Sequence, residues 1–135
     1  MNDIKPIEKV QTAFNDQREK RGYVAPVDVL MDMGVLSKQK YEDWRFGKVP
    51  YLEQVCTCNL RKLSVIMKQI RSCAQTLGLK PSFCFYKHWG KKKKGMNKVI
   101  SLRFSKSGHP DIERQYATHY VDHKRIEELK EEKRT

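Results

Sequence analysis

Acidic residues are missing from the middle of this chain, since no Asp or Glu occurs between Gln54 and Pro110. The same 57 residues hold thirteen Lys and Arg side chains. The segments before and after them are close to neutral, so the formal net charge of +12 lies almost entirely in the middle. One-sided charge of this kind attracts polyanions and speeds their association. The charge distribution therefore predicts a nucleic-acid-binding protein, with DNA or RNA as the partner.

Long apolar runs are absent as well. No stretch approaches the roughly 18 apolar residues that span a bilayer, and the first residues, Met1–Pro6, have no apolar core of a signal peptide. We therefore expect no membrane partner and a cytoplasmic location, where the four cysteines stay reduced. A chain of 135 residues is expected to form a single domain, 1–135.

The first part, 1–48, has helical periodicity and punctuation. Apolar residues recur every three or four positions over 4–21, which predicts a first helix. Pro26 suits the start of a second helix that Gly34 ends, and Ser37 is a good N-cap for a third through 38–46. The last two helices resemble a helix-turn-helix in outline, although the second has a mixed outward side.

The second part, 49–79, predicts one long helix that begins near Pro50. Its apolar seam comprises Leu52, Cys56, Asn59, Leu63, Ile66, Ile70, Cys73 and Leu77. Steps of four and three place these side chains on one side, with only cations on the other. The seam is expected to fill the chain's own core, or alternatively to form a homodimer through the 52–77 helix.

The third part, 82–106, predicts a basic β-hairpin, because Ser82–Trp89 and Val99–Ser105 are rich in aromatic and β-branched residues. Alternation places Phe83 and Phe85 inside and Tyr86 and His88 outside. The alternative is that the last helix covers the second face, with Tyr86 in the core. The fourth part, 110–135, predicts a C-terminal helix with a charged tail.

The predicted fold class is α+β, mainly α. It has three short N-terminal helices, one long central helix, a β-hairpin with a basic tip and a C-terminal helix. The order of these elements resembles a winged helix, with the hairpin as the wing.

The predicted interface consists of cations for phosphates and of two residues for bases or sugars. Tyr86 and His88, beside a guanidinium, are suited to stacking on unpaired bases, which favours RNA or single strands. The predicted phosphate contacts are Arg61, Lys68, Arg71, Lys87, Lys91, Lys92, Lys93, Lys94, Lys98, Arg103 and Lys106.

No cofactor, metal or catalytic residue is predicted. Cys56, Cys58, Cys73 and Cys84 lack the usual zinc spacing, and residues two apart on a helix point about 200° apart. His119 and His123 are four apart, but they share a stripe with apolar residues, which favours a place in the core. Two alternatives remain: a small nuclease using His109, Glu113 and His119, and an adaptor for an acidic protein.

Overall fold

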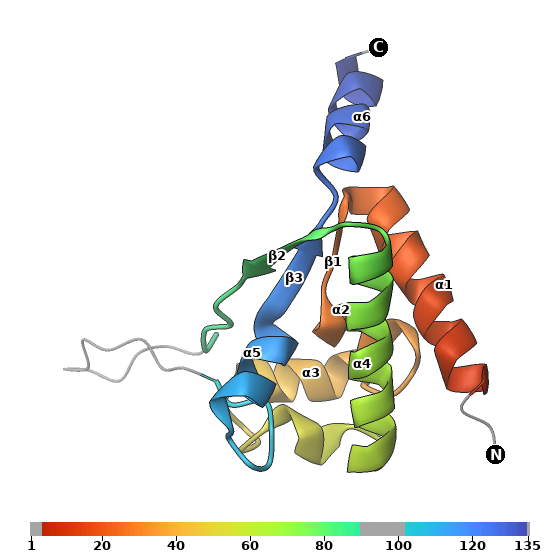
Figure 1. The fold of residues 1–135 in the computed structure, drawn as a ribbon. Helices are drawn as coiled ribbons and strands as arrows, with labels where there is room; N and C mark the ends of the chain where they lie inside the picture. Colours follow the sequence, from red (N-terminus) through yellow and green to blue (C-terminus); the bar gives the residue numbers. More distant parts are fainter. Residues whose placement is uncertain (1–3, 90–101, 135) are drawn as a thin grey trace.

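The computed structural model describes residues 4–89 and 102–134, and the side chains from residue 7 onward. The described chain is an α+β fold, mainly α, with a small antiparallel sheet (Figure 1). Its elements in order are α1 (Ile4–Arg21), β1 (Tyr23–Val24), α2 (Pro26–Asp32), α3 (Lys38–Arg45), the 3₁₀ helix η1 (Leu52–Val55), α4 (Leu60–Thr76), β2 (Lys80–Phe83), α5 (Pro110–Ala117), β3 (Thr118–Val121) and α6 (His123–Arg134).

The three N-terminal helices are confirmed. Helix α1 has the predicted bounds, and Val10 and Phe14 of its apolar stripe are fully buried. Proline 26 opens α2, and the Ser37 hydroxyl accepts a hydrogen bond of 3.2 Å from the Lys40 amide at the start of α3. These boundaries depend on local chemistry, which the sequence displays directly.

The long central helix is shorter than predicted. Helix α4 begins at Leu60, where the Asn59 side chain accepts a 2.9 Å bond from the Lys62 amide. Ahead of it, the amides of Leu52 and Glu53 donate to the backbone carbonyls of residues 103 and 104, at 3.2 and 2.9 Å. A helix running through from Pro50 is wrong because these long-range bonds hold Leu52–Val55 as a separate 3₁₀ turn.

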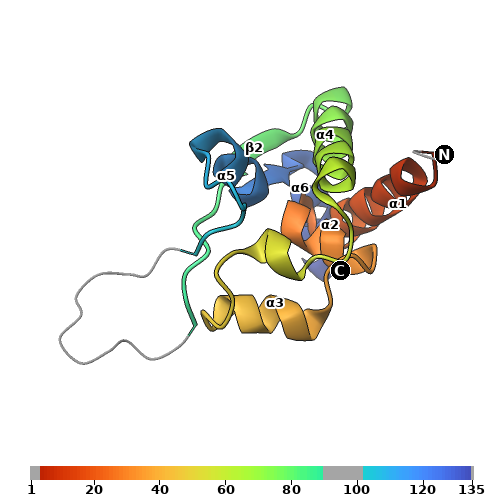
Figure 2. The same ribbon diagram turned by 90° about the horizontal axis from the view of Figure 1, so that it is seen from below.

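The apolar face of α4 fills the chain's own core. Leu63, Ile66 and Ile70 are at most 1% exposed, and α4 lies beside α1 (Figures 1 and 2). These side chains are therefore not exposed to a second copy of the chain. Homodimerisation through the 52–77 helix stays a prediction.

The predicted C-terminal helix is interrupted by a strand. Thr118–Val121 forms β3, the central strand of the sheet, in the order β1-β3-β2. Val24 pairs with Tyr120 on one side, and Ser82 pairs with His119 on the other. The continuous helix over 110–135 is wrong because a run of β-branched and aromatic residues here completes two strand pairs at once.

The predicted hairpin differs in its pairing. Strand β2 covers Lys80–Phe83 and pairs with β3, while residues 102–105 form no strand. The basic tip, including Lys91–Lys94 and Lys98, lies outside the described residues, so the winged-helix-like arrangement stays a prediction.

Helix α6 projects away from the other elements (Figure 1) and buries none of its residues. Two ion pairs join the start of α6 to α1. The side chain of Arg125 lies 3.1 Å from that of Glu19, and Asp122, just before α6, lies 3.0 Å from Arg18. Across 4–89 and 102–134, no helix combines the length and the apolar character that crossing a membrane requires.

Candidate nucleic-acid interface

The aromatic residues after α4 have the opposite orientation to the predicted one. Phe83 is 64% exposed and Phe85 is 53% exposed, whereas Tyr86 is only 9% exposed. The alternation correctly separated Phe83 and Phe85 from Tyr86, but it assigned the two phenylalanines, rather than Tyr86, to the core. Of the two alternatives for Tyr86, the exposed stacking residue is wrong and the core position is confirmed. The last helix does not cover it as that alternative expected, because the Tyr86 ring packs between Trp44 of α3 and Phe104.

The exposed aromatic side chains of this segment lie close in sequence to two exposed lysines. We call Lys80, Phe83, Phe85, Lys87 and Trp89 the 80–89 strip; all five are exposed. Trp89 is anchored to the end of α3, because its amide donates to the Arg45 carbonyl at 2.8 Å. The Arg45 guanidinium also lies 4.4 Å from the centre of the Trp89 ring. Lys80, Phe83, Phe85 and Trp89 were not predicted as site residues. Of the strip, only Lys87 was predicted, and Phe83, Phe85 and Trp89 are separated from it by even numbers of residues along the chain.

A proline blocks strand addition at the strip. The Cys84 amide donates to the Ala117 carbonyl at 2.9 Å, and hydrogen-bonded positions alternate along an antiparallel pair. Pro81 and Phe83 therefore direct their backbone groups to the outer edge of the sheet, where Pro81 has no N–H to donate. A ligand on this edge is expected to contact side chains rather than add a strand.

The predicted cations that lie within the described residues fall into two groups. Arg61, Lys68, Lys87 and Lys106 are exposed, and none of them pairs with a carboxylate of the described residues. All the ion pairs of the described chain instead join α1, α2 and the segment 122–134. The exposed charges of α4 and the neighbouring loops are thus available to an external polyanion.

Two predicted phosphate contacts are partly engaged within the chain. Arg71 donates to the Gln115 side chain at 2.9 Å, joining α4 to α5. Arg103 donates to the carbonyl of Ser105 at 2.8 Å and to that of Lys106, and so braces its own loop. Both side chains have structural contacts in addition to any role on a surface.

His88, predicted to contact bases, is half-buried. Its Nε2 atom lies 2.9 Å from the Phe46 carbonyl, and its ring packs on Gly47. Gly47 has φ of +74°, and a Cβ atom there would lie 2.7 Å from the imidazole. Only glycine fits both the backbone conformation and the close ring. His88 therefore helps to fix the strip to the end of α3.

His119 occupies the half-buried position that its apolar stripe predicted, but on β3 rather than on a helix. Its ring stacks on Tyr23 at 5.8 Å, and Nε2 lies 2.9 Å from the Tyr86 hydroxyl. Burial lowers the pKa of His119, Asp28 opposes this shift and Arg21 adds to it. Burial also raises the pKa of Tyr86, so the phenol keeps its proton. The tautomer of His119 sets which of the two groups donates the hydrogen bond between them.

We expect His119 to make the protein less stable in acid. Its lowered pKa means that the unfolded chain binds the proton more readily, so its stabilising contribution is complete above the ordinary pKa of 6.5 and declines as the pH falls below it. His119→Gln, which keeps an acceptor for Tyr86, should reduce the loss of unfolding free energy between about pH 7.5 and pH 5.5. Urea unfolding measures this, with the exposed His123→Gln as control. An unchanged pH dependence in His119→Gln would contradict it.

The residues of the nuclease alternative have structural roles. Glu113 accepts hydrogen bonds from the amides of Phe104 and Ser105, at 2.9 and 2.6 Å, and from the Ser105 hydroxyl. The His109 ring accepts a 3.2 Å bond from the Asp111 amide and so caps α5. His119 contacts Tyr86, and among the described residues no hydrogen bond or ion pair joins His109, Glu113 and His119 to one another.

The cysteines are not arranged as predicted. Cys56 and Cys58 lie in the turn between η1 and α4, so the argument that a helix separates their side chains is wrong. Burial raises the pKa of Cys56 to about 12, with Cys58 and Glu53 adding to the shift. Within the described ranges, no group of three or more His, Cys, Asp or Glu side chains could hold a metal ion.

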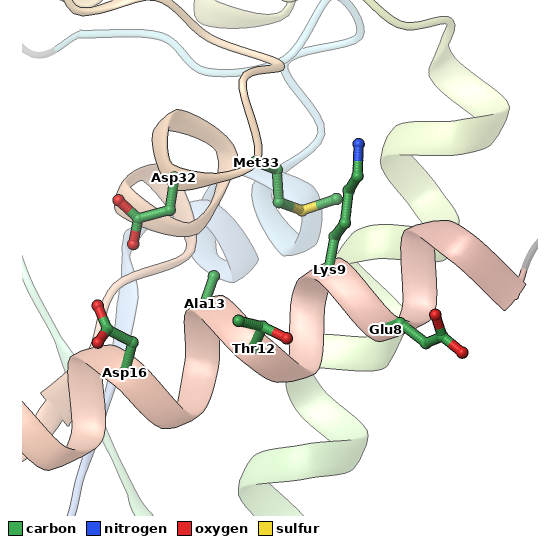
Figure 3. A pocket seen from close by; sticks show the side chains of 7 residues that line it. All are labelled: Glu8, Lys9, Thr12, Ala13, Asp16, Asp32 and Met33. Atoms are coloured by element: carbon green, nitrogen blue, oxygen red, sulfur yellow. The ribbon is translucent and has the colours of Figure 1, made fainter.

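A groove of about 830 Å³ lies between α1 and α2, and its Asp16 and Asp32 also line a neighbouring groove that reaches Trp89 of the strip. Asp16 and Asp32 lie near one another at one end of it, and Glu8 lies at the other (Figure 3). Its charge has the wrong sign for a nucleic acid. Repulsion from these carboxylates favours an approach of a polyanion from the side of α4 rather than from the Trp89 end of the strip.

Comparison with protein-family models, with curated proteins and with solved structures finds no match to this chain.

Proposed function

We propose that this protein binds nucleic acid without catalysing a reaction, and that it holds single-stranded RNA or DNA on the 80–89 strip. The observation that carries the proposal is the exposure of Phe83 and Phe85 between Lys80 and Lys87 in a segment without acidic residues. Aromatic rings stack on unpaired bases regardless of sequence, and flanking lysines neutralise the phosphates.

A single strand suits this surface better than a duplex. Stacking needs bases whose faces are accessible, and these faces are covered in a duplex. Helix α3, the second helix of the helix-turn-helix outline, presents Lys38 and Lys40 together with Glu42 and Asp43, which is a poor surface for a duplex groove. Arg61, Lys68 and Lys106 extend the positive surface beyond the strip and would contact phosphates of the same strand.

The test is binding of labelled single strands, measured by fluorescence anisotropy at several salt concentrations. Affinity should fall with salt, with a slope of about −0.7 per phosphate contact on a log–log plot. Phe83→Ala and Phe85→Ala should each weaken binding by about 1–3 kcal/mol and leave the slope unchanged, because they remove stacking alone. Lys80→Ser with Lys87→Ser should flatten the slope and weaken all sequences alike, because phosphate contacts carry no sequence information.

Two controls make the test specific. Leu77→Ala removes another exposed apolar side chain, 46% exposed, outside the strip, and should leave affinity unchanged. Poly-glutamate tests the adaptor alternative: binding to it as tight as to RNA or DNA, insensitive to Phe83→Ala, would favour that alternative over the proposal. Degradation of the labelled strands with a divalent metal would instead support a nuclease.

A further inference from the structure

A second groove, of about 510 Å³, lies between α4 and α5. Leu60, Met67 and Ile112 give it apolar walls, and Leu60 is 49% exposed although it is a large aliphatic residue. This volume falls within the range of about 300–1,000 Å³ that is typical of small-ligand sites. One nucleotide fits such a space, with a flat base against the apolar walls.

The groove also contains hydrogen-bond donors that lack partners. Gln115 uses its oxygen to accept from Arg71 at 2.9 Å, which leaves its amide N–H groups without a partner among the described residues. The Ser64 hydroxyl likewise has no partner in the part of the chain that the structure describes. The edges of nucleobases carry ring nitrogens and carbonyl oxygens that accept such bonds.

The charge at the groove suits a phosphate. Lys106 lies at its rim with no ion pair to a described carboxylate, and Arg61 is exposed in the adjoining first turn of α4. The one carboxylate of the lining, Glu53, is already bound: it accepts from the Lys106 amide at 2.8 Å and from the Tyr116 hydroxyl at 2.7 Å. Each oxygen of Glu53 thus has a donor within the chain, and the two cations Arg61 and Lys106 outnumber this one negative charge.

Helix α5 connects the groove to the 80–89 strip. Its last residue, Ala117, accepts from the amide of Cys84, which lies between the two exposed phenylalanines, and its Ile112 and Gln115 line the groove. Eight helical residues span about 12 Å. We infer that the groove binds one unstacked nucleotide, base and phosphate together, of the strand that the strip holds. This inference rests on the proposed function.

The experiment titrates the full chain with AMP, GMP, CMP and UMP, and with ribose 5-phosphate as the probe without a base. Amide shifts in NMR should map binding to Ser64, Lys106 and Gln115, and ribose 5-phosphate should bind at least tenfold more weakly. Ser64→Trp fills the groove and should weaken nucleotide binding by roughly tenfold or more. Ser72→Trp, on an exposed part of α4 outside the groove, should not change it.

Gln115→Glu is a second variant that does not fill space. It keeps an acceptor for Arg71 and removes the unpartnered N–H groups, so roughly tenfold weaker nucleotide binding is expected. Circular dichroism confirms that each variant is folded. Equal affinity of ribose 5-phosphate and the nucleotides, or equal affinity of the wild type and Ser64→Trp, overturns the inference.

Anisotropy with long strands separates the two proposals. Salt-sensitive binding of a strand without nucleotide shifts in the groove overturns the inference and leaves the proposed function in place. Nucleotide binding in the groove without salt-sensitive binding of a strand overturns the proposed function and leaves the groove as a mononucleotide site.

Discussion

Trp44→Ala should lower the free energy of unfolding by about 3–5 kcal/mol, the range for deleting a large buried aromatic side chain. Trp44 is fully buried, and its ring centre lies 5.0 Å from that of Phe104 and 5.8 Å from that of Tyr86. Its indole N–H donates to the Arg103 carbonyl at 2.8 Å. The substitution leaves a cavity and removes one of the two hydrogen bonds that the Arg103 carbonyl accepts, the other coming from the Leu52 amide at 3.2 Å. Urea unfolding followed by circular dichroism measures the loss.

Trp44→Phe separates the two contributions. It keeps an aromatic ring in the core and removes the N–H donor with only part of the ring volume, so the expected loss is smaller, about 1–3 kcal/mol. If Trp44→Phe and Trp44→Ala reduce stability equally, packing against Phe104 and Tyr86 contributes little, and this description of the core is wrong.

Glu113→Ala should destabilise the protein by about 2–4 kcal/mol, although Glu113 lies near the surface. Its carboxylate accepts from the amides of Phe104 and Ser105, which are buried with their side chains at 4% and 1% exposure. Removing the carboxylate leaves these amides without an acceptor, and each such loss costs about 1–3 kcal/mol. The loop 103–109 should also exchange its amide hydrogens faster.

Asp111→Ala is the matched control for Glu113→Ala, because Asp111 is an exposed carboxylate in the same first turn of α5. Its loss removes a favourable charge at a helix N-terminus, worth about 0.3–1 kcal/mol. Both variants lose one negative charge, so the difference between them isolates the hydrogen bonds. Equal destabilisation by the two would show that charge alone matters at this turn.

The elements that follow from nearby residues were predictable from the sequence. Ser37 caps α3 and Pro26 opens α2, because a cap or a fixed φ angle acts within three residues. The core face of α4 was also predictable, since Leu63, Ile66 and Ile70 repeat at the helical period. The fold class was confirmed because it depends on these patterns together.

The wrong predictions of secondary structure share one physical cause, which is hydrogen bonding between segments that lie far apart in the sequence. The 3–4 period continues back through Leu52, but the bond from its amide to the carbonyl of Arg103 excludes it from α4. Thr118–Val121 fits a helical stripe locally, but it forms a strand because β1 and β2 lie on both sides of it. The short stretches of sequence from which helices and strands are predicted do not contain both partners of such a bond.

The candidate site was predicted only in part, again because some of its features depend on distant segments. The exposed state of Arg61, Lys68, Lys87 and Lys106 follows from their charge, which is a property of each residue alone. The orientation of Phe83, Phe85 and Tyr86 depends on which neighbour covers the segment. Its neighbours are β3 and the core around Trp44, so the aromatic side that faces solvent was predicted wrongly.

Pro81 also bears on contacts between copies of the chain. An edge strand with exposed phenylalanines beside it is the arrangement from which sheets grow between molecules into fibrils. At the outer edge of β2, the missing N–H of Pro81 interrupts the ladder that an incoming strand needs, and Lys80 adds repulsion between copies. The chain can thus keep Phe83 and Phe85 in contact with water at high concentration without self-assembly.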